Sequence, residues 1–229
     1  MPAIDRQEVL RYLGYRGQEL SIELSALIDE CMDACIRTAT PRKVTRRFSC
    51  KADETGVQIE EIDLLLPGRD IGAHLQHSGA CVLMAATLGL GVDNFIKRLE
   101  NTDLTRSLIL DACATALIES VCDAAEDEVR KEAEAAGMKI TSRFSPGYGD
   151  LPLELQPRLI AVLDTPRRIG LFCSETHILI PRKSVTAIIG IRPEGDEECR
   201  PRRGCGRRCA DCRLTGCLYR KEEARHEDS

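Results

Sequence analysis

The residues best suited to bind a charged ligand lie in one short stretch, Arg143-x-x-Pro146-Gly147-Tyr148. The planar guanidinium of an arginine can pair with both oxygens of a carboxylate. Proline fixes one backbone dihedral of a turn and glycine frees the next, so the backbone can approach a ligand closely. The tyrosine ring can stack on a flat polar ligand or bond it. The stretch alone is also typical of an ordinary surface turn, so its function depends on what surrounds it.

A long helix is expected directly before this turn, between residues 104 and 136. Asp103 can cap its start and Gly137 can end it, and residues 138–141 are then expected to be extended. Apolar residues recur at spacings of three and four and predict one buried stripe, formed by Leu110, Ala114, Leu117, Val121, Ala125 and Val129. A different face, roughly opposite, is formed by Ala112, Thr115, Glu119, Cys122 and Glu126.

The helix and the turn together resemble the activation domain of cobalamin-dependent methionine synthase. The helix contains Val129-Arg130-Lys131, and Glu119 precedes this triplet by the distance at which the family has a ligand-binding glutamate. Arg143 and the Gly147–Tyr148 pair fall on the family's contacts with its cofactor. The resemblance covers residues 100–190, including Ile180–Ala187, which is similar to the start of the family's closing strand. The second tyrosine that the family brings to the ligand has no counterpart here.

The resemblance implies a free-standing component that binds S-adenosylmethionine and supports the reductive remethylation of cob(II)alamin. The residues that would bind the cofactor are Glu119, Arg143, Pro146, Gly147 and Tyr148, and none is expected to act as an acid or a base. The cobalamin would be carried by a partner, a methionine synthase that lacks this domain, and an electron donor would also be needed. The chain would then be inactive without its partner. The alternative is a non-catalytic ligand-sensing or scaffold protein of corrinoid metabolism with the same fold.

A cysteine-rich tail follows Ile191, where apolar residues nearly vanish. Four of its cysteines follow the spacing C-x3-C-x2-C-x4-C, namely Cys205, Cys209, Cys212 and Cys217. Four thiolates are the right number for a structural zinc ion or an iron–sulfur cluster, and the surrounding arginines would favour the thiolate form. A segment with so few apolar residues would need such a metal to fold. The tail therefore predicts a metal site. An iron–sulfur cluster would suit electron delivery, and zinc would serve structure alone.

Composition limits the other functions. The net charge is −5 and only 3% of the residues are aromatic, which argues against a nucleic-acid binder built on the arginine-rich tail. The first residues do not resemble a signal peptide, and no apolar stretch approaches the about 20 residues that span a bilayer. We therefore expect a cytoplasmic protein without a membrane or nucleic-acid partner. In a reducing compartment its 12 cysteines are expected to be thiols or metal ligands.

The fold class expected from the remaining patterns is α+β, with a twisted antiparallel sheet and long helices. Helices are expected at residues 5–13, 19–38, from 92, and 153–163, with a short one near Asp70. A hairpin is expected over 44–59, a central strand over 80–86, and closing strands at 178–180 and 184–191. Residues 1–192 would form the activation-domain-like part, with helical and hairpin elements in 1–100 and the cofactor-binding part in 101–192. Residues 193–229 would form the metal-binding tail.

Three further motifs are better explained by structure than by chemistry. Cys31 and Cys35 share the buried side of a helix, and cysteine is among the most buried residue types. His74, His77 and Cys81 have a spacing that a metal could use, but spacing alone rarely makes a metal site, so a capping or half-buried role is favoured for the histidines. The Thr87–Gly91 loop could cradle a phosphate, yet it lacks the further residues of the nucleotide-binding motifs and is expected to be a tight turn.

Overall fold

A computed structural model of the chain describes residues 3–193. The chain forms two compact units whose segments alternate along the sequence. The first unit comprises residues 3–44, 86–125 and 165–185, and the second comprises residues 45–85, 126–164 and 186–193. The four tail cysteines of the predicted metal site, Cys205, Cys209, Cys212 and Cys217, lie outside the described residues. No helix between residues 3 and 193 is both long and apolar enough to cross a bilayer.

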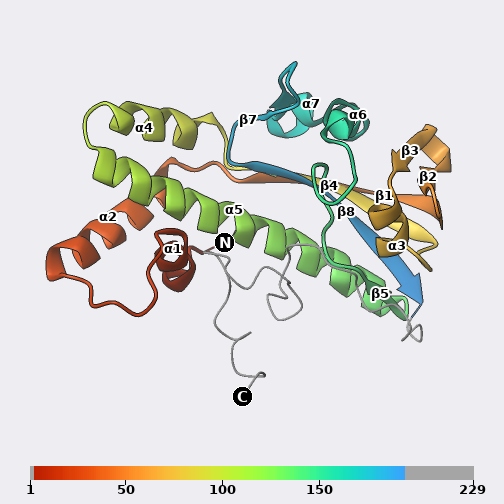
Figure 1. Cartoon of the computed structure of the whole chain (residues 1–229), viewed down its shortest axis with the longest axis horizontal. Coiled ribbons are helices and arrows are strands. Elements are labelled where there is room, and N and C mark those ends of the chain that lie inside the picture. The colour runs from red at the N-terminus through yellow and green to blue at the C-terminus, as the bar shows by residue number, and fades with distance from the viewer. Residues whose placement is uncertain (1–2, 194–229) are drawn as a thin grey trace. The chain divides into compact units, whose positions relative to one another are not determined.

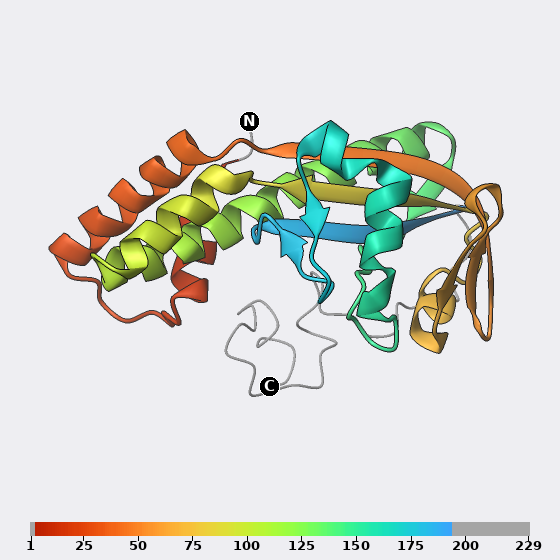
Figure 2. The ribbon, with the colours of Figure 1, turned by 90° about the horizontal axis from the view of Figure 1, so that it is seen from above.

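The first unit is mainly helical. Its elements are α1 (Arg6–Tyr12), α2 (Ile22–Thr38), α4 (Leu90–Glu100), the first part of α5 (Leu104–Ala135), α7 (Thr165–Ile169), and the small hairpin of β6 (Phe172–Cys173) and β7 (Leu179–Ile180). Helices α2 and α4 lie side by side (Figure 2). Asp5 caps α1 by accepting a hydrogen bond from the Gln7 amide at 2.8 Å.

The second unit is built on a six-stranded sheet with the order β3-β2-β1-β4-β8-β5 (Figure 1). The strands are β1 (Arg42–Asp53), β2 (Gly56–Ile59), β3 (Leu64–Pro67), β4 (Ala80–Thr87), β5 (Met138–Ile140) and β8 (Ser184–Pro193). The paired strands β1–β2, β2–β3 and β5–β8 are antiparallel. Every residue of β4 is buried, which confirms the predicted central strand. The helical elements are α3 (Arg69–His74), α6 (Gln156–Leu163), the last part of α5, and the 3-10 turns η1 (Glu60–Ile62) and η2 (Leu153–Leu155).

Helix α5 begins and ends as the sequence predicted. The Asp103 side chain accepts a hydrogen bond from the Arg106 amide at 3.0 Å, and Gly137 follows the helix end with φ +68°. The predicted apolar stripe is buried throughout. However, Ala112, Cys122 and Glu126 on the other predicted face are buried as well, so α5 is covered on more than one side. The periodicity located the helix but underestimated its burial.

Several local predictions need correction. Ile36 shares its helix with the buried Cys31 and Cys35 but is 46% exposed. The expected helix over 153–163 divides into η2 and α6. Pro157 stands at the start of α6, where its missing amide hydrogen costs nothing. Of the two expected closing strands, only β8 joins the main sheet, because β7 pairs with β6. Strands β3 and β6 were not predicted.

Cys31, Cys35 and His74 are buried, whereas His77 is exposed, so a half-buried position is wrong for His77. Cys31 and Cys35 are 3% and 0% exposed. His74 is buried, and its Nε2 lies 2.8 Å from the Ser142 carbonyl oxygen. Gly89 stands before α4 with φ +79°, and the backbone approaches Thr40 so closely that a side chain there would collide with it. The Thr87–Gly91 loop therefore has a steric reason for its first glycine.

Candidate functional site

The last part of α5 holds a buried carboxylate between two arginines. Glu126 is 4% exposed. One of its oxygens accepts a hydrogen bond from Arg130 Nη2 at 2.6 Å, and the other lies 3.3 Å from Arg143 Nε. A buried carboxylate is tolerated only when it is paired, and two guanidiniums provide that pairing. The Arg143 side chain is itself only 17% exposed, so its guanidinium has a defined position.

The segment after α5 runs along β8 and carries Arg143 and Phe144 to their places. The Thr141 amide donates to the Gly190 carbonyl at 2.9 Å, and Phe144 forms an antiparallel bridge with Ile188. Phe144 is 2% exposed and packs against His74, with the ring centroids 5.1 Å apart. Since Arg143 contacts α5 and Phe144 contacts α3, the two neighbouring side chains are directed to different elements.

The Pro146–Tyr148 turn closes on itself through its backbone. The Gly147 amide donates to the Leu151 carbonyl at 2.8 Å, and the Tyr148 amide donates to the Ser145 carbonyl at 3.0 Å. Gly147 has φ +89°, which side chains rarely adopt. These two amides therefore hold the shape of the turn. The group that the turn exposes is the Tyr148 side chain, which is 43% exposed and meets the Phe144 ring edge-on at 6.3 Å.

The same loop is anchored to the first residues of α3. The Asp150 carboxylate accepts hydrogen bonds from the Arg69 amide at 2.7 Å and the Asp70 amide at 3.1 Å. Gly68 and Gly149 allow a close approach here, because a Cβ on either would collide with an aspartate side chain. Loop residues that are 80 positions away in sequence thus act as the cap of α3. The turn is held at both ends, by β8 and by α3.

His74 supports the loop from α3. Its Nε2 lies 2.8 Å from the Ser142 carbonyl oxygen, which requires a donated hydrogen, so this nitrogen carries the proton. Burial lowers the pKa of His74 from its ordinary value, and the hydrogen bond to Ser142 opposes this only in part. Burial therefore favours the neutral form of the His74 ring, and in that form the ring donates to the loop at Ser142.

Glu119, expected to bind the ligand's amino group or its sulfonium charge, lies in the part of α5 that belongs to the first unit. It is half-buried and interacts electrostatically with Tyr12 of α1. Burial raises the pKa of Tyr12, and the Glu119 charge adds to this, while Arg11, placed 4.3 Å from the ring centroid, opposes it. A shared cleft for Glu119 and Arg143 stays a prediction.

The Ile180–Ala187 segment, which resembles the family's closing strand, brings a lysine to α5 within the first unit. Lys183 Nζ lies 2.9 Å from Asp111 and 2.8 Å from Thr115 Oγ1, and the side chain is 13% exposed. The Arg182 amide donates to Asp93 of α4. The Lys183 charge is thus held by groups of the first unit.

Sequence reasoning placed Arg143, Pro146, Gly147 and Tyr148 in one turn, and the structure places them in one loop of the second unit. It did not assign a role to Glu126, the buried partner of Arg143. The sequence does contain a signal for part of this pairing: Glu126 and Arg130 are four residues apart, so their side chains meet on a helix. Among the described residues no group of three histidine, cysteine or acidic side chains could hold a metal ion.

No protein-family model and no curated protein matches the sequence. Among solved structures, a crystal structure of the MetH reactivation domain bound to AdoHcy matches with a TM-score of 0.64 and 17% sequence identity. The match covers 83% of this chain and 74% of that one. The chain shares the fold of that domain. The α+β class with a curled antiparallel sheet, expected from the sequence, is confirmed by this match and by the strand pairing.

Proposed function

We propose that the chain binds S-adenosylmethionine and supports the remethylation of cobalamin held by a separate partner chain. Two observations support this proposal. The chain shares its fold with a domain that binds AdoHcy, the product left when S-adenosylmethionine gives up its methyl group. The loop with Arg143, Pro146, Gly147 and Tyr148 also has a fixed shape in that fold.

The observation that carries the proposal is the contact between Arg143 and Glu126, at 3.3 Å and largely buried, beside the Pro146–Tyr148 turn. A guanidinium held through Nε has its orientation set before a ligand arrives, and a preorganised group costs less on binding. In the proposal, Arg143 binds the carboxylate of the ligand's amino-acid end. Glu119 binds its amino group or stabilises its sulfonium charge, and the Tyr148 ring supports its flat part.

The proposed reaction needs one electron from a donor, which reduces cob(II)alamin to cob(I)alamin. The methyl group then passes from the sulfonium of S-adenosylmethionine to cobalt, and AdoHcy is released. The reduced cobalt is itself the nucleophile, so the chain supplies no acid or base. Its task is to position the sulfonium and exclude water, which is catalysis by orientation. We propose that a separate donor supplies the electron and that the partner chain holds the cobalamin.

Equilibrium binding tests the first half of the proposal. Titration calorimetry of the full chain with AdoHcy is expected to show one saturable site. Arg143→Lys keeps the charge but loses the planar fork, so we expect binding to weaken roughly tenfold. Arg46→Lys is the matched control, because Arg46 donates to the Val162 carbonyl and lies over the Phe48 ring, away from the turn. Absence of AdoHcy binding by the full chain would reject the proposal.

Methyl transfer separates the proposal from the non-catalytic alternative. The assay combines the chain with a cobalamin-bearing methionine synthase that lacks this domain, a one-electron reductant, and S-adenosylmethionine labelled in its methyl group. The proposal predicts labelled methylcobalamin that depends on the chain and is lost with Arg143→Ala. Binding of AdoHcy without any methyl transfer would favour a ligand-sensing or scaffold protein instead.

A further inference from the structure

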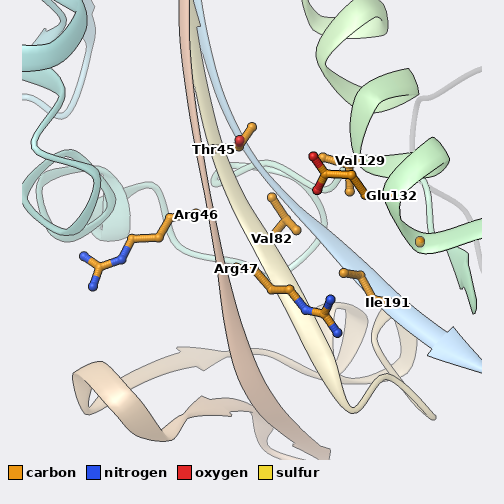
Figure 3. A pocket seen from close by; sticks show the side chains of 8 residues that line it. Thr45, Arg46, Arg47, Val82, Val129, Glu132 and Ile191 are labelled. Atoms are coloured by element: carbon orange, nitrogen blue, oxygen red, sulfur yellow. The ribbon is translucent and has the colours of Figure 1, made fainter. Parts of the chain in front are cut away.

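A small hollow lies between the sheet and the last part of α5, within the second unit (Figure 3). Its volume is about 190 Å³. Its floor is apolar and consists of Val82 from β4, Ile191 from β8, and Val129 and Ala133 from α5. Pockets for drug-sized ligands measure about 300–1,000 Å³. This hollow therefore suits a molecule with an apolar part of only a few carbons.

Two side chains of opposite charge stand at the hollow. Figure 3 shows Glu132 reaching from α5 toward the strands and Arg47 extending from β1 across β4. Both side chains are exposed, and neither makes a hydrogen bond or an ion pair with any other residue between 3 and 193. The second arginine that lines the hollow, Arg46, donates to the Val162 carbonyl. The hollow thus combines an apolar floor with one cationic and one anionic group that have no partner among residues 3–193.

We propose that this hollow binds a small zwitterion, an α-amino acid with an apolar side chain. Its carboxylate would pair with the Arg47 guanidinium and its ammonium group with the Glu132 carboxylate. Its side chain would cover the floor formed by Val82 and Ile191. A ligand with one charge would leave either Arg47 or Glu132 unpaired beside an apolar group, whereas a zwitterion pairs with both. An amino acid with a charged side chain would desolvate that charge on the floor.

The hollow is separate from the turn that is proposed to bind S-adenosylmethionine. None of the residues that line it belongs to the Ser145–Leu151 loop or to the Glu126–Arg143 pair. The proposal needs neither AdoHcy binding nor a partner chain, so each site can fail without the other.

The test is a ¹H–¹⁵N NMR titration of the full chain with L-norleucine. We expect saturable shifts at the amides of Thr45, Arg47, Val82 and Ile191. L-norleucinamide lacks the carboxylate and hexanoate lacks the ammonium group. Each is expected to bind at least about tenfold more weakly, because a hydrogen bond to a charged group contributes roughly that factor.

Variants that remove one charge each test which protein side chain binds the ligand's carboxylate and which binds its ammonium group. Arg47→Gln and Glu132→Gln alter exposed side chains, so the fold is expected to persist, and each should weaken norleucine binding about tenfold or more. Arg46 also lines the hollow, but its side chain points to the other side of β1, where it donates to the Val162 carbonyl (Figure 3). Arg46→Gln is therefore the control for Arg47, because it removes a neighbouring charge that does not face the hollow. Glu134→Gln is the control for Glu132, since it is exposed and lies two residues further along α5, on another side of the helix. Ala133→Leu should fill the hollow and weaken binding while both charges stay.

Three outcomes of the titrations with the wild-type chain would overturn the proposal. They are the absence of saturable shifts, shifts at residues 145–150 in place of those at the hollow, and equal affinities for norleucine and both analogues. Arg47→Gln and Glu132→Gln that bind as the wild type does would also overturn it. AdoHcy titrated into the same samples reports on the other site. Glu132→Gln is expected to keep AdoHcy binding, so failure at the hollow and failure at the turn give different results.

Discussion

Two glutamates on the last part of α5 have opposite surroundings. Glu126 is 4% exposed and lies between Arg130 and Arg143, while Glu132 is exposed beside the hollow, where Arg47 also stands. A charge without water needs a partner inside the protein, so burial fixes the position of Arg143. An exposed charge is hydrated and can exchange its water for a ligand. Buried Glu126 therefore orients Arg143, whereas exposed Glu132 is available to bind a ligand.

The largest expected effect is the loss of stability when the buried glutamate is removed. Glu126→Ala leaves two guanidiniums without their common partner, and we expect the free energy of unfolding to fall by roughly 3 kcal/mol. Glu132→Ala should change it by less than about 0.5 kcal/mol, because the side chain is exposed. Urea denaturation of both variants measures the difference. Equal effects would show that the pairing around Glu126 does not stabilise the fold.

The second prediction compares the two arginines as ligand contacts. Arg143→Ala should weaken AdoHcy binding roughly tenfold to a hundredfold, because the hydrogen bonds to a charged group contribute about 1.5–3 kcal/mol. Arg47→Ala should leave AdoHcy binding unchanged, since Arg47 lines the hollow and not the turn. Calorimetry gives both dissociation constants. A large effect of Arg47→Ala with none of Arg143→Ala would reverse the roles assigned to the two regions.

A third prediction concerns the shape of the turn beside Arg143. Gly149 has φ +53°, and a Cβ there would collide with Asp70, so Gly149→Ala should cost about 2 kcal/mol of stability and weaken AdoHcy binding. Gly147 has φ +89°, but its nearest contact for a Cβ is Leu153 at 3.5 Å, so Gly147→Ala should cost about 1 kcal/mol. Thermal unfolding ranks the two variants. If Gly147→Ala lost more stability than Gly149→Ala, the contact of the loop with α3 would not determine the conformation of the turn.

The smallest predicted effect is a pH dependence from His74, another buried group of the second unit. Its pKa is lowered in the folded protein, so below the ordinary histidine pKa of about 6.5 the unfolded chain takes up a proton that the folded chain does not. His74 should therefore stabilise the fold fully above that pH and progressively less as the pH falls. His74→Gln, which can keep a donor to Ser142, should lose less stability between pH 7 and 5.5 than the wild type. Identical pH slopes would contradict the burial of a neutral His74.

The sequence was most informative where local chemistry decides the structure. Asp103 and Gly137 marked the ends of α5, and the patterns of residues 44–59 and 80–86 marked the first hairpin and the central strand. Each of these depends on neighbours within a few residues.

What the sequence did not predict depends on contacts between distant segments. The capping of α3 by Asp150 joins residues 80 positions apart, and it leaves no local pattern. The hollow at Arg47 combines one helix with three strands. Strand β3 pairs with β2 over Leu64–Pro67, where no strand was expected. Glu126 shows the boundary between the two cases, because its pairing with Arg130 is local and its pairing with Arg143 is not.

The central claim is that Arg143 and Glu119 bind the amino-acid end of a sulfonium methyl donor. A crystal structure of the chain with AdoHcy tests it most directly. We predict that the AdoHcy carboxylate lies within hydrogen-bond distance of the Arg143 guanidinium, and its amino group within hydrogen-bond distance of Glu119. AdoHcy bound elsewhere, without contact to Arg143 or to Glu119, would contradict the account.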